Sequence, residues 1–198
     1  MRRLLSTLLL LLPLLACSPR DYLTRRLAAD LIATSDAFST PQQFWLRTGV
    51  ISNRDYAAPE FLVLQRRGWI AGTAAVCPPQ VGPPPCWDVV LTPLGVDAFH
   101  DLLKGADPSK HSFSVPVAKR DLVSVTGISK TGNTADVEFV FQWVPTSEVG
   151  AALITSGLQF RSTVGFRRFD DGWRVMQGGT PRSSQSLDDA LKTAIPSS

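Results

Sequence analysis

Histidine and cysteine, the residues most common in metal centres and nucleophilic catalysis, are scarce in this sequence, which has two histidines and three cysteines. His100 lies between Asp97 and Asp101 in a predicted helix, and His111 lies beside Lys110 in a predicted loop. A catalytic or metal-binding role would require a further ligand or a nucleophile from elsewhere in the chain. We therefore interpret both histidines as surface residues and expect neither a metal ion nor a cofactor.

The signature motifs of several enzyme classes are also missing. The chain contains no HExxH zinc-protease motif, no GxSxG nucleophile elbow, no SxxK motif, no phosphate-binding loop and no dinucleotide fingerprint. Asp170-Asp171-Gly172 lacks the further ligands that Ca²⁺ needs, about six to eight oxygens in all, and is typical of a hairpin turn. These absences favour a protein that is not an enzyme.

No hydrophobic run is long enough to cross a bilayer, because a membrane-spanning helix needs about 20 apolar residues. The longest run, Leu4 to Leu15, has about a dozen residues and follows Arg2 and Arg3. A short positive start followed by such a run is typical of a secretory signal peptide. We assign residues 1–16 to this signal. The remaining residues, about 180, suffice for one large or two small domains, and we prefer two.

The signal ends in Leu14-Leu15-Ala16-Cys17, which resembles the lipobox of bacterial lipoprotein precursors. Membership of that family implies cleavage before Cys17, acylation of its side chain and amino group with palmitate-type chains, and attachment to the cell envelope. Ser18, in place of an aspartate, implies the outer membrane, with the protein facing the periplasm. Residues 17–20 would be a lipidated tether. The alternative is an ordinary secretory signal with Cys17 merely near the cleavage site.

The basic charge of the sequence does not indicate a nucleic-acid partner. The formal net charge is +3, but removal of Arg2 and Arg3 with the signal would leave 18 basic and 17 acidic side chains. A nearly balanced protein has no general attraction for polyanions. We therefore expect the bilayer and another envelope protein or component as partners, and no nucleic acid.

Cys77 and Cys86 remain as a pair once Cys17 is assigned to the lipobox, and disulfides persist in exported proteins. Their spacing excludes a CxxC redox motif. The segment between them contains five prolines, which lack amide donors and restrict φ, so it cannot be helical. We predict a disulfide that pins the stiff tip of a β-hairpin, with Pro83, Pro84 and the adjacent Trp87 as candidate partner-binding residues.

Helical patterns dominate the segment 21–105, which we interpret as one module. Apolar residues at helical spacing predict a helix over 21–38, and cap residues predict helices at 40–49, 59–68 and 92–103. Segments 69–76 and 87–91 have strand character and would form the arms of the hairpin.

The entry Gly68-Trp69-Ile70 and the exit Leu91-Thr92-Pro93-Leu94-Gly95 of this hairpin resemble those of a winged-helix module. That family implies DNA recognition through its third helix. Here that helix offers only Arg66 and Arg67 at its far end, and an envelope lipoprotein meets no genome. We expect a winged-helix-like shape used as a protein-binding surface.

Beyond a predicted linker at 106–112, the segment 113–180 is mostly strand. Ala135, Val137 and Phe139 alternate with Asp136 and Glu138, which predicts a strand with one buried face. Residues 165–175, around Asp170-Asp171-Gly172-Trp173, resemble the closing hairpin of cystatin-like (nuclear-transport-factor-2-like) domains. The predicted fold is therefore α+β, a helical module with a hairpin followed by an antiparallel β-sheet domain. A flexible tail is expected at 181–198, with a brief helix from Leu187 to Ala194.

Arginines on the closing hairpin are further candidate partner-binding residues. Arg167, Arg168 and Arg174, with Arg161, would line one side of the hairpin. They would either face an anionic partner or form a solvated strand face opposite Asp136 and Glu138. Two alternatives to a binding or structural lipoprotein stay open. One is an envelope hydrolase using paired carboxylates, Asp136 with Glu138 or Asp97 with Asp101. The other is a small-ligand protein with an apolar pocket facing Phe139, Phe141 or Phe166.

Overall fold

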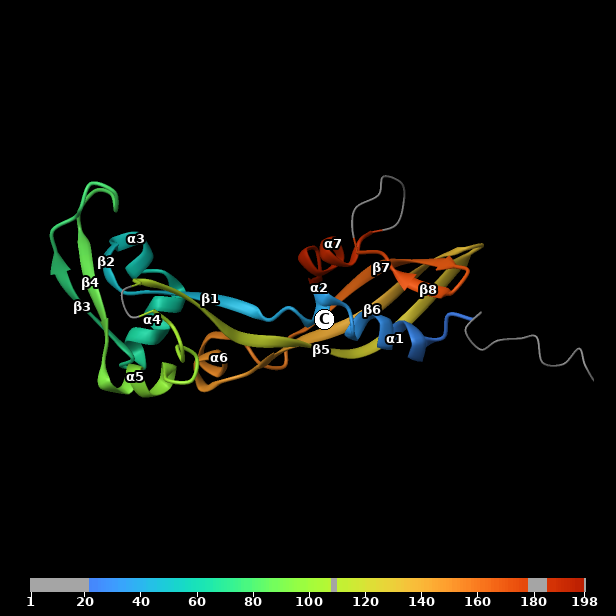
Figure 1. The fold of residues 1–198 in the computed structure, drawn as a ribbon, viewed down its shortest axis with the longest axis horizontal. Helices are drawn as coiled ribbons and strands as arrows, with labels where there is room; N and C mark the ends of the chain where they lie inside the picture. Colours follow the sequence, from blue (N-terminus) through green and yellow to red (C-terminus); the bar gives the residue numbers. More distant parts are fainter. Residues whose placement is uncertain (1–21, 108–109, 178–184, 198) are drawn as a thin grey trace, which may run out of the picture. The chain divides into compact units, whose positions relative to one another are not determined.

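The computed structural model describes residues 22–107, 110–177 and 185–197, so the predicted signal peptide and Cys17 lie outside the described residues. The fold is mixed α and β with mostly antiparallel sheet. The chain forms two compact units, of which unit 1 includes residues 22–38, 122–141 and 160–197 and unit 2 includes residues 39–121 and 142–159. Figure 1 labels the helices and strands.

The larger sheet has six strands in the order β1-β5-β6-β7-β8, with β9 also paired to β7. Its strands are β1 (Gln42–Arg47), β5 (Ser112–Thr131), β6 (Thr134–Pro145), β7 (Gln159–Phe169), β8 (Gly172–Val175) and β9 (Ile195–Pro196). Strands β5 and β6 are long, and each contributes residues to both units.

Unit 1 buries aromatic side chains between this sheet and the helices α1 (Arg25–Ala33) and α2 (Asp36–Ser39). Phe38 meets Phe141 edge to face with ring centroids 6.1 Å apart, and Phe141 stacks on Phe160 at 5.5 Å. The alternation predicted along β6 is confirmed, because Ala135, Val137 and Phe139 are buried while Asp136 and Glu138 are exposed. The tight turn between β7 and β8 is also as predicted, with Gly172 at φ +127°.

The described part of the C-terminal segment contains the brief helix that we expect at 187–194. Residues Leu187–Lys192 form helix α7, capped by the Ser186 side chain. Leu187 and Ala190 are fully buried, and the Ser162 hydroxyl donates to the carbonyl of Ala190 at 2.6 Å. The buried side chains of Leu187 and Ala190, with the hydrogen bond from Ser162, attach this helix to the rest of unit 1.

Unit 2 contains a three-stranded antiparallel sheet in the order β2-β4-β3. Its elements, besides β1 and the first half of β5, are β2 (Gly49–Ser52), α3 (Asn53–Tyr56), α4 (Pro59–Arg66), β3 (Ile70–Ala75), β4 (Cys86–Leu91), α5 (Pro93–Phe99) and α6 (Glu148–Leu153). The buried core of this unit includes Leu46, Leu64, Val89, Phe99 and Val115.

Several local predictions for unit 2 are confirmed. Helix α4 begins at Pro59 and is followed by Gly68 at φ +68°. Strands β3 and β4 pair as the arms of the predicted hairpin, from Ile70 opposite Leu91 to Ala75 opposite Cys86. The Thr92 hydroxyl accepts from the Gly95 amide and caps α5. Each signal acts over a few residues, which is why a single sequence reveals it.

The N-terminal helical module is not confirmed as a unit. The helix predicted at 40–49 is wrong, because Gln42–Arg47 is strand β1, paired with β5 from Gln42 opposite Ala118 to Arg47 opposite Ser112. This pairing buries Leu46 completely and outweighs the local capping pattern at Thr40 to Gln43. Helix α1 belongs to unit 1 and not to the unit that holds the hairpin.

The two compact units also differ from the expected domains at 21–105 and 113–180. Residues 106–112 do not separate them, because β5 begins at Ser112 and its first half belongs to the same unit as the β3–β4 hairpin. Two of the divisions between units fall instead within β5 and β6, where no change of composition indicates them, and the others follow Phe38 and Gln159.

Candidate functional site

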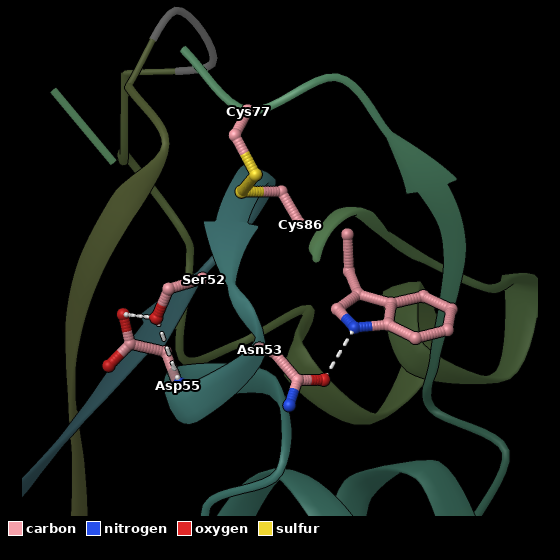
Figure 2. Close-up of a disulfide and its surroundings, with 6 residues drawn as sticks. Ser52, Asn53, Asp55, Cys77 and Cys86 are labelled. Carbon is pink, nitrogen blue, oxygen red and sulfur yellow. Dashed lines mark hydrogen bonds between the residues drawn. A yellow bond between two sulfur atoms is a disulfide. The ribbon is translucent and has the colours of Figure 1, made fainter. Parts of the chain in front are cut away.

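The predicted disulfide between Cys77 and Cys86 is present, with Cα atoms 5.3 Å apart, an ordinary separation for such a bridge. Cys86 is buried at the start of β4 and lies opposite Ser52 at the end of β2. Figure 2 shows the bridge above Ser52, Asn53 and Asp55, where β2 passes into α3. The disulfide therefore connects the Pro-rich loop, residues 78–85, to the centre of the three-stranded sheet.

The Pro-rich loop is held at its base by backbone hydrogen bonds. The Val81 amide donates to the carbonyl of Pro78 at 3.0 Å, and the Asn53 amide donates to the carbonyl of Pro85 at 3.1 Å. Pro83 and Pro84, the predicted partner-binding prolines, are exposed. The loop thus presents exposed prolines from a base that is tied to both β4 and α3.

Three hollows in unit 2 share lining residues, and the loop lines two of them. The first has a volume of about 370 Å³ and is lined by β2, the loop residues Gln80 and Val81, and His111. The second, of about 580 Å³, lies between α3 and the loop prolines. The third, of about 280 Å³, is lined by β1 and the start of α4. Asp55 borders all three, so we call them together the Asp55 groove.

Asp55 is held in place by two side chains of the groove. Arg47 Nη1 lies 2.9 Å from Asp55 Oδ2, and these side chains are 48% and 38% exposed. The Ser52 hydroxyl donates to the same carboxylate oxygen at 3.1 Å and accepts from the Asp55 amide at 3.2 Å (Figure 2). Ser52 therefore caps α3 and orients the carboxylate. Arg47, Ser52 and Asp55 thus hold one another in defined positions in the groove.

His111 lies in the first hollow, directly against the bend between β1 and β2. The Thr48 amide donates to the His111 carbonyl at 2.9 Å. Gly49 has φ +71°, and a Cβ built on it would lie 3.1 Å from His111 Nδ1. Only glycine suits both the backbone conformation and the space at this bend. His111 is a surface residue, as we interpreted it. Nothing in the neighbouring sequence predicted that it lies beside the groove.

Trp87, a predicted partner-binding residue, is half-buried and engaged by its own unit. Its ring stacks on Tyr56 with centroids 4.8 Å apart, and its Nε1 donates to Asn53 Oδ1 at 2.9 Å. It therefore supports α3 beside the groove, and a direct partner contact stays a prediction. The more exposed tryptophan is Trp45, 59% exposed and lining the third hollow. Sequence reasoning missed it because its segment was assigned to a helix.

The arginines of the closing hairpin do not all line one side. Arg167 and Arg174 are directly opposite one another on β7 and β8, whereas Arg168 is opposite Trp173. Because side chains alternate along a strand, Arg168 points to the other face. All three are exposed. The Arg174 guanidinium donates to Asp171, and this hydrogen bond holds the pKa of Asp171 below its ordinary value of 3.8.

The residues of the two open alternatives lie outside the Asp55 groove. The paired carboxylates, Asp97 with Asp101 and Asp136 with Glu138, are exposed. The aromatic residues proposed to face a ligand pocket, Phe139, Phe141 and Phe166, are buried and packed in the core of unit 1. His100 is exposed, with Nδ1 3.2 Å from Asp101 Oδ1. Neither alternative gains support from these positions.

The described residues offer neither a metal site nor a membrane-spanning helix. Among them, no three or more His, Cys, Asp or Glu side chains are grouped so that they could hold a metal ion. Within the same residues, no helix is long and apolar enough to cross a membrane. Comparison of the chain with models of protein families, with curated proteins and with solved structures gave no match.

Proposed function

We propose that this protein is a cell-envelope lipoprotein, acylated on Cys17 in the outer membrane, that binds another envelope protein through the Asp55 groove. The lipobox Leu14-Leu15-Ala16-Cys17 supports the anchor. The observation that carries the binding role is the Cys77–Cys86 bridge, which holds a loop of restricted conformation along the groove. A partner surface that is ordered before binding loses less entropy when the complex forms.

The partner segment in this proposal is an extended peptide. Strand β2 is at one end of the order β2-β4-β3, so one of its edges has no strand partner in the part of the chain that the structure describes. Val50, Ile51 and Ser52 of this strand line the first hollow. A peptide that adds to such an edge gains backbone hydrogen bonds, and nearby side chains supply specificity. Arg47, Asp55 and His111 are the side chains placed to do so.

Support for the winged-helix resemblance is limited to residues 49–99. Helices α3 and α4, the β3–β4 hairpin and α5 follow one another there in the order on which the resemblance rests. The loop between β3 and β4 would be the wing, and in this proposal it contacts a protein and not DNA.

Site-specific photo-crosslinking in intact cells tests the binding role. A photoreactive residue at Gln80, which is exposed and lines the first hollow, is expected to give one dominant protein adduct. Val96 on α5, 51% exposed and outside the three hollows, is the matched control position. The adduct should disappear when Cys77→Ala and Cys86→Ala are combined with the Gln80 probe. The same adduct from both positions, or its persistence without the disulfide, would refute the proposal.

A further inference from the structure

The end of unit 1 that carries the β7–β8 turn combines cations with exposed aromatic rings. The Arg167 and Arg174 guanidinium groups lie 5.6 Å and 5.0 Å from the ring centroid of Phe169, which is 44% exposed. Like charges directly opposite on paired strands are unfavourable, so this arrangement contributes little to folding. Asp171 pairs with Arg174 and offsets one of these charges, and an anionic partner would offset the other.

The neighbouring β5–β6 turn adds further groups to the same end of the unit. Lys130 Nζ lies 5.6 Å from the ring centroid of Tyr22 and 5.1 Å from that of Trp173. The Arg168 amide donates to the carbonyl of Asn133 at 2.8 Å, which ties the two turns together. Tyr22 is 59% exposed. The two turns and Tyr22 thus lie at one end of the unit, which we call the basic tip. Arg167, Arg174 and Phe169 are on one face of the sheet at this end, and Trp173, with Lys130 beside it, is on the other.

The charge of the basic tip is positive. Its cations are Lys130, Arg167, Arg168 and Arg174, and the carboxylates within the turn are those of Asp170 and Asp171. Asp171 pairs with Arg174, and further exposed carboxylates, Asp136 and Glu138, lie along β6 beyond the turn. The tip therefore carries more cations than anions at neutral pH.

The sequence distance from Cys17 limits how far the basic tip can lie from an anchored bilayer. Tyr22 is five residues after Cys17. A fully extended chain spans at most about 3.6 Å per residue, so these two Cα atoms are separated by at most roughly 18 Å. Because Lys130 lies against Tyr22, the tip must stay close to the headgroups if Cys17 is acylated.

We propose that the basic tip binds the anionic phospholipid headgroups of the bilayer that holds the anchor. This inference rests on the proposed acylation of Cys17 and assigns the protein a second membrane contact. The chemistry fits, because cations near an anionic leaflet are attracted to it and amphipathic aromatic rings favour the headgroup region. A single acylated residue leaves orientation free, whereas headgroup contacts at the tip restrict it.

A vesicle-binding experiment tests this contact separately from acylation. The mature chain from Cys17 to Ser198, carrying Cys17→Ser so that it cannot be acylated, is mixed with vesicles of equal parts phosphatidylcholine and phosphatidylglycerol, or of phosphatidylcholine alone. We expect binding to the anionic vesicles only, weakening as salt is added because exposed charges are screened. Arg167→Gln with Arg174→Gln should reduce the partition coefficient roughly tenfold or more at low salt.

The matched control removes the same charge from unit 2. Arg66 and Arg67 are exposed near the end of α4, and Arg66→Gln with Arg67→Gln should leave vesicle binding within about twofold of the parent chain. Absence of anionic-vesicle binding at low salt, equal binding to both vesicle types, or equal losses from the two double variants would overturn the inference. Those results would not affect the anchor itself, which is tested by the mass of the membrane-derived chain.

Discussion

Arg47 and Asp55 form an ion pair at the centre of the candidate binding groove, with Nη1 2.9 Å from Oδ2. The two residues come from β1 and α3, and Asp55 borders all three hollows of the Asp55 groove. A half-exposed pair contributes little to folding, about 0–1 kcal/mol, because water screens it. We therefore expect the ion pair to matter more for binding a partner than for the stability of the fold.

Arg47→Gln should separate these two roles. We expect the free energy of unfolding, measured in urea, to fall by less than about 1 kcal/mol. The yield of the crosslinked adduct from Gln80 should fall by more than this loss of stability accounts for. The reason is that the guanidinium and the orientation of Asp55 are lost together. Arg66→Gln, at an exposed arginine outside the groove, is the control for charge. A large loss of stability with unchanged crosslinking would assign the pair to folding instead.

Replacing both Cys77 and Cys86 with Ala should loosen the loop without unfolding the protein. On the chain-entropy model a bridge over a loop of this size is worth about 2.7 kcal/mol, and five prolines already restrict the unfolded loop. We expect a loss of at most about 3 kcal/mol in urea unfolding, unchanged far-UV circular dichroism and new proteolysis between Val76 and Trp87. Global unfolding, or free thiols in the exported native protein, would contradict this account.

Gly49→Ala should destabilise unit 2 for two separable reasons. A left-handed backbone costs a residue with a Cβ about 1–2 kcal/mol, and the new methyl group would also crowd His111. Gly132→Ala is the control for backbone strain alone, since Gly132 has φ +59° and a Cβ added there would meet nothing within 4 Å. Gly49→Ala should have a lower melting temperature than Gly132→Ala. Adding His111→Ala to Gly49→Ala should reduce this difference in melting temperature. Equal losses of stability in Gly49→Ala and Gly132→Ala would show that the His111 side chain moves away from the new methyl group without cost.

The titration of Asp171 reports the ion pair at the basic tip. The Arg174 hydrogen bond lowers the pKa of this carboxyl below its ordinary value of 3.8, so the pair favours folding at neutral pH. That contribution is lost as the pH falls through the lowered pKa. In Arg174→Gln the pKa of Asp171 should rise toward its ordinary value, followed by NMR of the side-chain carboxyl carbon. An unchanged pKa would mean that the two groups do not pair in solution.

The fold was predictable wherever a signal acts over a few residues. The Pro59 start of α4, the Thr92 cap of α5 and the Asp171-Gly172 turn all express local backbone preferences. Strand β1 was not predictable, because Thr40-Pro41-Gln42-Gln43 has the form of a helix cap. Its strand conformation depends on pairing with residues 112–118, about 70 positions later in the chain.

The candidate site was predictable only in part, for the same physical reason. The cysteine pair and the proline content indicated the bridged loop. The groove beside it combines Arg47, Asp55 and His111, which no local pattern connects. One signal was available, since Ser52 and Asp55 have the spacing of a helix cap and its first-turn acid, and would have located α3.

Intact mass measurement of the protein isolated from the membrane fraction tests the central claim, attachment through Cys17, most directly. We predict a chain that begins at Cys17 and carries the added mass of acyl chains on that residue, with Cys77 and Cys86 oxidised. The Cys17→Ala variant should lack this added mass and leave the membrane fraction, because each buried methylene group of an acyl chain contributes about 0.8 kcal/mol to membrane binding. An unmodified Cys17 in the mature protein, or cleavage at another position, would contradict the account.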